Sequence, residues 1–193
     1  GWSAEPGIKQ GVKVGNWMGY LDIAGFLMQY DDMMEFSFGK WEEDRGLTNF
    51  YGFGFKSINV GKTQISGVEL SVSGKGKITN DITMSILAGY TYMEPISLTP
   101  DDVYITTEND ELTYNNSSSD PSVLKYRYKH IAKIDAELIY KKLSLGGSFR
   151  YNDFMKNIDA IFASELFASV VPGVIEAREN GEDGDVIIDL RAG

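Results

Sequence analysis

The segment from Leu124 to Tyr140, LKYRYKHIAKIDAELIY, alternates between two kinds of side chain at every second position. Its even-numbered positions carry no formal charge, whereas six of the eight odd-numbered positions from Lys125 to Ile139 are charged. Because side chains alternate across a β-strand, this segment would have one apolar face and one ionic face. Strands of soluble sandwiches usually last only about 5–6 residues. The longer alternation, with aromatic residues at both ends of the apolar face, favours a strand between lipid and a polar lumen.

The overall composition permits such a strand and excludes other classes of protein. No stretch reaches the ~18 apolar residues that a membrane-spanning helix needs, and the nearest, from Ala160, is interrupted by Glu165 and Pro172. The net charge of -10 argues against a nucleic-acid partner, whose phosphates require clustered basic residues. Cysteine is absent, which excludes disulfides and thiolate metal sites.

The same period of two predicts further strands on both sides of this segment. Glycine, asparagine and lysine signals predict tight turns at Gly15-Asn16, over residues 73–81 and at Lys141-Lys142. Long polar stretches occupy the remaining connections, at 31–50, 94–123 and 153–185. With the segment 124–140, about seven strands are therefore predicted, and the others lie at 8–15, 17–29, 55–73, 82–92, 143–152 and 186–193.

The connections between these strands alternate between short and long, as they do in bacterial outer-membrane barrels. In such barrels the short turns lie in the periplasm and the long loops lie outside the cell. The three long stretches hold 21 acidic and 4 basic residues, so the predicted outer loops are strongly acidic.

The predicted strands divide their side chains between lipid and lumen. A charge facing lipid would cost about 2–4 kcal/mol at the bilayer midplane, so charged side chains should face a wet lumen. The predicted lumen-facing ionic residues are Lys125, Arg127, Lys129, Lys133, Asp135, Glu137 and Arg150. The predicted lipid-facing or interfacial residues are Tyr90, Tyr92, Tyr126, Tyr128, Ile134, Leu138, Tyr140, Phe149 and Tyr151, with Trp17 near a short turn.

Six segments, in order along the chain, resemble strands of TonB-dependent outer-membrane receptors, most closely those of Bacteroidetes. The first, AEPGIKQGVKVG, has Gln10 where the family usually has Glu, and the second, SINVGKTQISGVELSV, matches at Asn59, Gly61, Gly67 and Glu69. The others are AGYTYMEP, LKYRYKH, RYNDFMKNIDAIF and IIDLRAG.

This resemblance implies an all-β fold, in which residues 1–193 are the C-terminal portion of an antiparallel up-and-down barrel of ~22 strands. It implies an N-terminal plug domain and terminal strands outside this chain, so the chain is expected to be an internal piece of a longer protein. It also implies a bacterial outer-membrane location and uptake of a scarce nutrient (an iron chelate, haem, cobalamin, a glycan or a peptide), energised by the TonB complex. Outer-membrane lipid and a surface lipoprotein are the further partners it suggests.

The sequence shows no catalytic constellation, and we expect neither an enzyme nor a cofactor. His130 is the single histidine, which argues against a Ser/His triad or a histidine metal site. An acidic group in the second long stretch has two interpretations, a calcium site and a solvated loop, of which the solvated loop is favoured. Its residues are Asp101, Asp102, Glu108, Asp110 and Glu111. The loop candidates for substrate binding are Trp41, Phe50, Tyr51 and Tyr104. Apolar residues at helical spacing predict one helix over 160–178, which would cap the rim of the barrel.

Two other classes of protein fit the same sequence. One is a passive porin or an adhesin-type outer-membrane barrel, and the other is a soluble β-rich binding domain. A plug domain upstream of Gly1 would separate the receptor from the first alternative. A protein that needs no detergent to stay in solution would favour the soluble binding domain.

Overall fold

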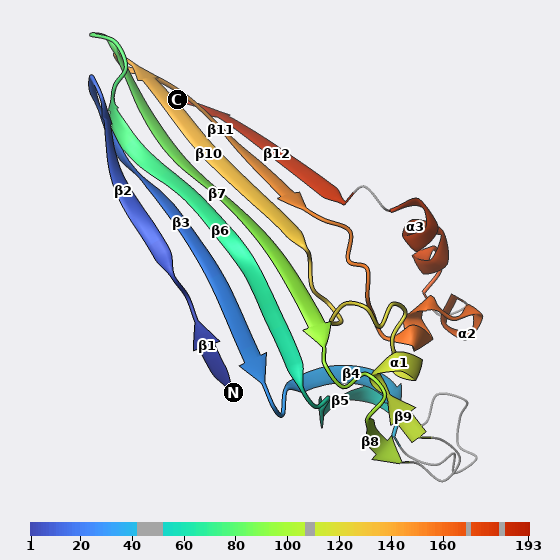
Figure 1. The fold of residues 1–193 in the computed structure, drawn as a ribbon. Helices are drawn as coiled ribbons and strands as arrows, with labels where there is room; N and C mark the ends of the chain where they lie inside the picture. The colour runs from blue at the N-terminus through green and yellow to red at the C-terminus, as the bar shows by residue number, and fades with distance from the viewer. Residues whose placement is uncertain (42–51, 107–110, 169–170, 182–183) are drawn as a thin grey trace.

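A single large antiparallel sheet forms most of the protein (Figure 1). The structure is a computed structural model that describes residues 1–41, 52–106, 111–168, 171–181 and 184–193. The strand order in this sheet is β1-β3-β6-β7-β10-β11-β12, and β2 also pairs with β3. β1 and β2 thus lie end to end along the same edge of β3, separated by Glu5 and Pro6.

The central strands are long enough to cross a bilayer, which takes about 9–11 residues of a tilted strand. β3, β6 and β7 have 15, 15 and 16 residues, and β10 has 11. The strands of the large sheet are β1 (Trp2–Ala4), β2 (Gly7–Val14), β3 (Asn16–Tyr30), β6 (Thr63–Lys77), β7 (Ile82–Ser97), β10 (His130–Tyr140), β11 (Leu143–Asn152) and β12 (Asp185–Ala192).

The connections follow the predicted rhythm of short turns at one end of the sheet and long segments at the other (Figure 1). Gly15 and Lys141 turn the chain at two of the short connections with φ angles of 59° and 56°. The long segments contain structure of their own. They hold the hairpin β4 (Met34–Lys40) and β5 (Phe53–Asn59), the hairpin β8 (Val103–Thr106) and β9 (Glu111–Thr113), and the helical segments α1 (Tyr114–Ser117), η1 (Ala160–Ala163), α2 (Glu165–Ala168) and α3 (Val174–Asn180).

Several predicted boundaries were wrong. The strand predicted over 55–73 is two strands, because the chain turns at Gly61, where φ is 82°. The turn predicted over 73–81 is shorter, since β6 continues to Lys77. In place of one helix over 160–178 there are three short helical segments, and α3 begins after Pro172 and Gly173. Proline and glycine both oppose a continuous helix at that point.

The strand predicted over 124–140 also begins later than expected, because residues 124–129 are irregular and β10 starts at His130. Tyr126 has a φ of 58°, a left-handed conformation that lies outside the β region. The sequence of residues 124–129 therefore alternates as a strand would, but these residues do not form one.

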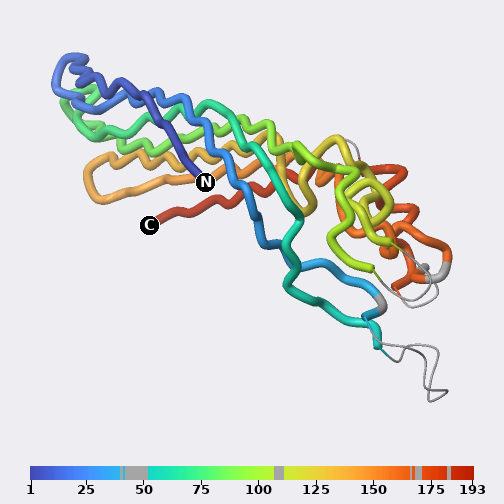
Figure 2. Tube along the Cα trace, turned by 60° about the horizontal axis from the view of Figure 1, so that its bottom comes forward, coloured from blue at the N-terminus to red at the C-terminus, as the bar shows by residue number. Residues whose placement is uncertain are grey.

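Buried apolar side chains lie at the long-loop end of the molecule and not against the sheet. Within the described residues, the buried hydrophobic side chains belong to Ile58, Val60, Tyr114, Val123, Leu124 and Phe167. The first three and Leu124 form one cluster, against which Trp41 and Tyr104 pack. In two views, no other element of the described chain lies over either face of the large sheet (Figure 1, Figure 2).

Candidate functional sites: the uncharged face and the loop cluster

From the short turns to the level of Tyr92, one face of the large sheet carries no Asp, Glu, Lys or Arg on any of its strands. The pairing registers place Ile23, Leu70, Tyr90, Ala132 and Tyr151 in one row across five strands. We call this the uncharged face. By strand, its residues are Ile8, Gln10, Val12 and Val14; Trp17, Gly19, Leu21, Ile23, Gly25 and Leu27; Val68, Leu70, Val72, Gly74 and Gly76; Ile82, Met84, Ile86, Ala88, Tyr90 and Tyr92; His130, Ala132, Ile134, Ala136, Leu138 and Tyr140; Leu143, Leu145, Gly147, Phe149 and Tyr151; Val186, Ile188, Leu190 and Ala192.

Apolar side chains on this face are exposed. Ile8 is 73% exposed, Ile134 44% and Leu190 83%. Soluble monomers rarely expose contiguous apolar patches larger than a few hundred Å². An exposed apolar face of this extent is typical of a surface that contacts another protein or a membrane.

Aromatic and polar groups mark the two ends of the uncharged face. At the long-loop end, the Tyr90 hydroxyl lies 2.7 Å from Nδ1 of His130, and the Tyr92 ring packs on the same imidazole. The first charge on this face is Glu94, two positions beyond Tyr92, where it accepts a hydrogen bond from Lys129 at 2.6 Å. At the short-turn end, the Trp17 indole lies over Gly19 and Gly74, in space that side chains there would fill.

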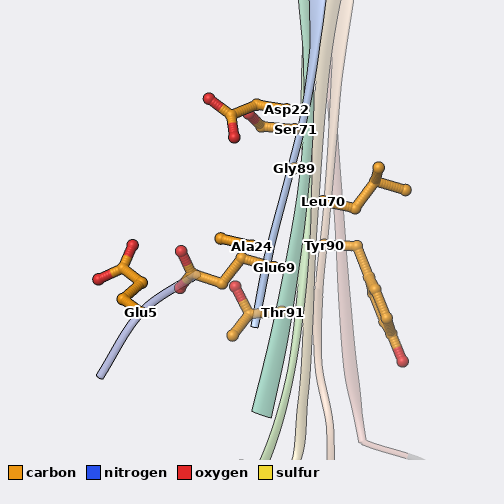
Figure 3. Close-up of a pocket in the computed structure, with 9 residues that line it drawn as sticks. All are labelled: Glu5, Asp22, Ala24, Glu69, Leu70, Ser71, Gly89, Tyr90 and Thr91. Carbon is orange, nitrogen blue, oxygen red and sulfur yellow. The ribbon is translucent and has the colours of Figure 1, made fainter. Parts of the chain in front are cut away.

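The opposite face of the sheet, which we call the polar face, carries the charged residues of the strands, together with exposed apolar residues such as Met18, Leu87 and Ile187. Figure 3 shows the carboxylates of Glu5, Asp22 and Glu69 on one side of the sheet, while Leu70 and Tyr90 point to the other. The three carboxylates surround a shallow depression of about 260 Å³ beside Gly89.

Ion pairs cross the strands on this polar face. Lys9 pairs with Asp22 at 3.9 Å, and Arg150 pairs with Asp189 at 3.3 Å.

The predicted face residues divide into two groups. The predicted apolar residues Tyr90, Tyr92, Ile134, Leu138, Tyr140, Phe149 and Tyr151 all belong to the uncharged face, while Lys133, Asp135, Glu137 and Arg150 lie on the polar face. Whether these faces meet lipid and lumen stays a prediction.

The other predicted face residues precede β10, and their assignment to a strand face was wrong. They are Lys125, Tyr126, Arg127, Tyr128 and Lys129.

Lys125 is buried instead at the centre of the long-loop end. Its ammonium Nζ lies 2.7 Å from Oδ1 of Asp159, and both side chains are 1% exposed. The same ammonium donates to Ser117 at 3.0 Å and to Ser37 at 3.2 Å. Residues from all three long connections therefore meet at this lysine.

Asp159 accepts enough hydrogen bonds to compensate for the burial of its charge. Oδ1 accepts from the Ser37 hydroxyl at 2.6 Å as well as from Lys125. Oδ2 accepts from the Phe38 backbone N–H at 2.8 Å and from the Tyr126 hydroxyl at 2.6 Å. A buried ion pair is tolerated only when such additional bonds satisfy its remaining sites, and here they do.

A second carboxyl group, Glu35, lies in the same region and is less well satisfied. Glu35 is 8% exposed, and its Oε2 accepts a hydrogen bond from the Tyr114 hydroxyl at 3.3 Å. Oε1 is buried without a partner among the described residues. Burial raises the pKa of Glu35, and the nearby Arg127 and Lys125 oppose this effect. We call Glu35, Ser37, Tyr114, Ser117, Lys125, Tyr126 and Asp159 the loop cluster.

Two of the predicted substrate-binding residues pack inside the same end of the molecule. The Trp41 indole donates to the Gly54 carbonyl at 2.6 Å, and the Tyr104 hydroxyl donates to Ser117. Burial raises the pKa of Tyr104. Phe50 and Tyr51 lie outside the described residues.

A group of phenylalanines lies on the β4–β5 hairpin and the helical segments after β11. The rings of Phe38 and Phe162 are 4.9 Å apart, and those of Phe38 and Phe167 are 5.3 Å apart. This group joins the first long connection to the third.

The sequence analysis missed Glu35, Ser37, Tyr114 and Asp159 as members of one cluster. Ser37 and Asp159 are separated by 122 positions in the chain, so no local pattern could have paired them. Nor does the local sequence distinguish Lys125, since Arg127 and Lys129 follow in the same alternation with aromatic residues.

Three further points concern metal ions, the calcium interpretation and membrane-spanning helices. In the described part of the chain, no group of three or more His, Cys, Asp or Glu residues is arranged to hold a metal ion. Of the proposed calcium residues, Glu108 and Asp110 lie outside the described ranges. None of the described helices is both long and apolar enough to cross a bilayer.

Comparison with known proteins gives no family assignment, since no family model and no curated protein matches the chain.

Proposed function

We propose that the chain is part of the wall and outer loops of an outer-membrane receptor of the TonB-dependent type, which imports a scarce nutrient. The observation that carries this proposal is the uncharged face, which is exposed and, from the short turns to the level of Tyr92, free of Asp, Glu, Lys and Arg on every strand. In the proposed receptor, lipid covers this face and the polar face borders a wet lumen.

The dimensions of the uncharged face suit a bilayer. β10 has 11 residues from His130 to Tyr140, both of which lie on this face. A strand of this length rises about 34 Å, and a tilt of about 45° reduces its height to about 25 Å, the height of the apolar band in such barrels. Tyr90, Tyr92 and Trp17 then occupy the interfacial positions where aromatic residues gather.

The polar face supports the same arrangement. Three carboxylates line the depression at Gly89, and ion pairs cross the neighbouring strands. Charged groups in such number require contact with water.

In this proposal, the ligand binds to the long loops. Loops held on a rigid scaffold commonly carry binding residues, and the three long connections all emerge at one end of the sheet (Figure 1). The strong excess of acidic residues in these connections favours a ligand with cationic groups.

The decisive experiment measures the surroundings of two neighbouring positions in the full-length protein reconstituted in lipid. Spin labels at Ile134→Cys and Lys133→Cys report on opposite faces of β10. We expect high collision rates with lipid-soluble oxygen at position 134 and with a water-soluble nickel chelate at position 133. Equal accessibility at the two positions would exclude a membrane strand and favour a soluble β-rich domain.

A second measurement separates the receptor from a passive porin or an adhesin. Cells that take up the nutrient are treated with a protonophore, which removes the energy that TonB transmits. Uptake should stop while surface binding continues. Uptake that persists would indicate a porin, and binding without any uptake would indicate an adhesin.

A further inference from the structure

The loop cluster brings together segments that are far apart in the chain. Ser37 and Phe38 come from β4 in the first long connection, Ser117 from α1 in the second, and Asp159 from the third. All of them contact the Lys125–Asp159 pair, directly or through one of its hydrogen bonds. In Figure 1 these elements gather beyond the same end of the sheet.

Glu35 lies two residues before Ser37 on β4 and reaches the same cluster through Tyr114. The Tyr114 hydroxyl donates to Glu35 and accepts from the Lys125 backbone N–H at 2.6 Å. Tyr114 therefore links the Glu35 carboxyl group to the segment that carries Lys125.

The Glu35 carboxyl group has few hydrogen-bond donors to stabilise a negative charge. An ionised carboxylate needs several donors when it is buried, but Oε1 has none among the described residues and Oε2 has a single long bond. The carboxyl group of Asp159, which pairs with Lys125, adds repulsion and raises the pKa of Glu35 further. The titratable and charged groups around Glu35 are Tyr104, Tyr114, Tyr126, Lys125, Arg127 and Asp159.

We propose that the protonation of Glu35 controls the stability of the loop cluster. The cluster holds the three long connections together while this carboxyl group is protonated, and it loosens when the carboxyl group ionises. This inference goes beyond the proposed function, because it requires only the described contacts and no particular ligand or membrane.

The direction of the pH effect follows from the burial of Glu35. Burial raises the pKa of Glu35 above its ordinary value. The cluster is therefore fully held below that ordinary value, and its stability is lost as the pH rises through the higher value of the folded protein. One proton is involved, so the equilibrium constant for loosening rises by at most about tenfold per pH unit.

The test is hydrogen–deuterium exchange of the full-length protein between pH 4 and pH 8. Opening constants are obtained for peptides covering 33–40, 112–126 and 156–165 after division by the chemical exchange rate at each pH. Peptides from β10 and β11 serve as the reference for the sheet. We expect the three loop peptides to lose protection together as the pH rises, while the reference peptides do not change.

Variants identify the group responsible. Glu35→Gln is neutral at every pH and should give loop protection that does not depend on pH. Glu111→Gln, at an exposed carboxyl in β9, should behave as the wild type does. Tyr114→Phe removes the one donor that Glu35 has among the described residues, and it should move the transition to higher pH.

Two results would overturn the proposal. One is a wild-type profile that is independent of pH, and the other is the same pH-dependent profile in Glu35→Gln as in the wild type. If Glu35→Gln fails to fold, its reference peptides lose protection too, and the shift in Tyr114→Phe then decides. These readouts are independent of the label accessibilities at positions 133 and 134, so either proposal can fail alone.

Discussion

Arg191 on β12 reaches across β11 to Asp135 on β10, with its two terminal nitrogens 2.7 and 2.8 Å from the two carboxylate oxygens. The residue between them is Gly146, whose missing side chain leaves room for the guanidinium group. A Cβ atom at position 146 would lie 2.6 Å from Nε of Arg191. The bidentate pair between strands that are not neighbours therefore depends on a glycine in the strand between them.

We predict that Gly146→Ala displaces Arg191 and lowers the thermal midpoint of the full-length protein in detergent. The cause is the loss of bidentate geometry, which fixes both partners better than a single contact does. The same substitution in an Asp135→Asn background should have a smaller effect, because the pair is already broken. An equal effect in both backgrounds would indicate that the alanine acts through the backbone of β11.

We predict that Ile134→Lys impairs assembly into lipid by about 2–4 kcal/mol, the cost of a cation near the bilayer midplane. Ser71→Lys is the matched control, since Ser71, Gly89 and Lys133 occupy one row of the polar face, next to the level of Ile134. The control should assemble normally beside Asp22. Reversible urea unfolding in lipid vesicles measures both variants, and equal stability of the two would argue against a lipid-facing surface.

We predict that Asp159→Asn destabilises the loop end by about 3–5 kcal/mol, because the Lys125 ammonium is then buried without a compensating charge. Limited proteolysis should show faster cleavage in the long connections, with the strands still protected. A Lys125→Met substitution added to Asp159→Asn should recover much of the loss, since removal of both charges is often close to neutral. Cleavage rates unchanged by Asp159→Asn would contradict the burial of this pair.

We predict that Tyr126→Phe weakens the loop cluster by about 1.5–3 kcal/mol, the usual value of a hydrogen bond to a charged group. The substitution removes the donor to Oδ2 of Asp159 and keeps the aromatic ring. Tyr128→Phe, two residues later in the same irregular segment, should have little effect by the same proteolysis measurement. If both variants behave alike, the Tyr126 hydroxyl does not contribute as the geometry indicates.

The faces of the strands could be predicted from the sequence because a strand alternates by geometry. Leu70, Tyr90 and Ile134 all lie on the side that the alternation predicts. Even the mixed strand 17–29 follows this rule, since Ile23 pairs with Leu70 and Asp22 with Ser71.

The end of a strand was harder to predict than its faces. Lys125 to Lys129 continue the alternation of β10, but tertiary contacts override it, because Asp159 draws Lys125 and Tyr126 into the loop cluster. The turn between β5 and β6 had a local signal that was not used. Asn59 accepts the Gly61 N–H in a side-chain turn at 3.0 Å, a common role of Asn before a glycine with positive φ.

The separation of 122 positions between Ser37 and Asp159 has a consequence for the order of folding. β-Hairpins such as β10–β11 close over two residues, so they form early from local contacts. The loop cluster can form only after the segments that carry β4, α1 and Asp159 have all been brought to one end of the sheet. We therefore expect it to be the last part of the described chain to assemble, because its contacts join positions far apart in sequence.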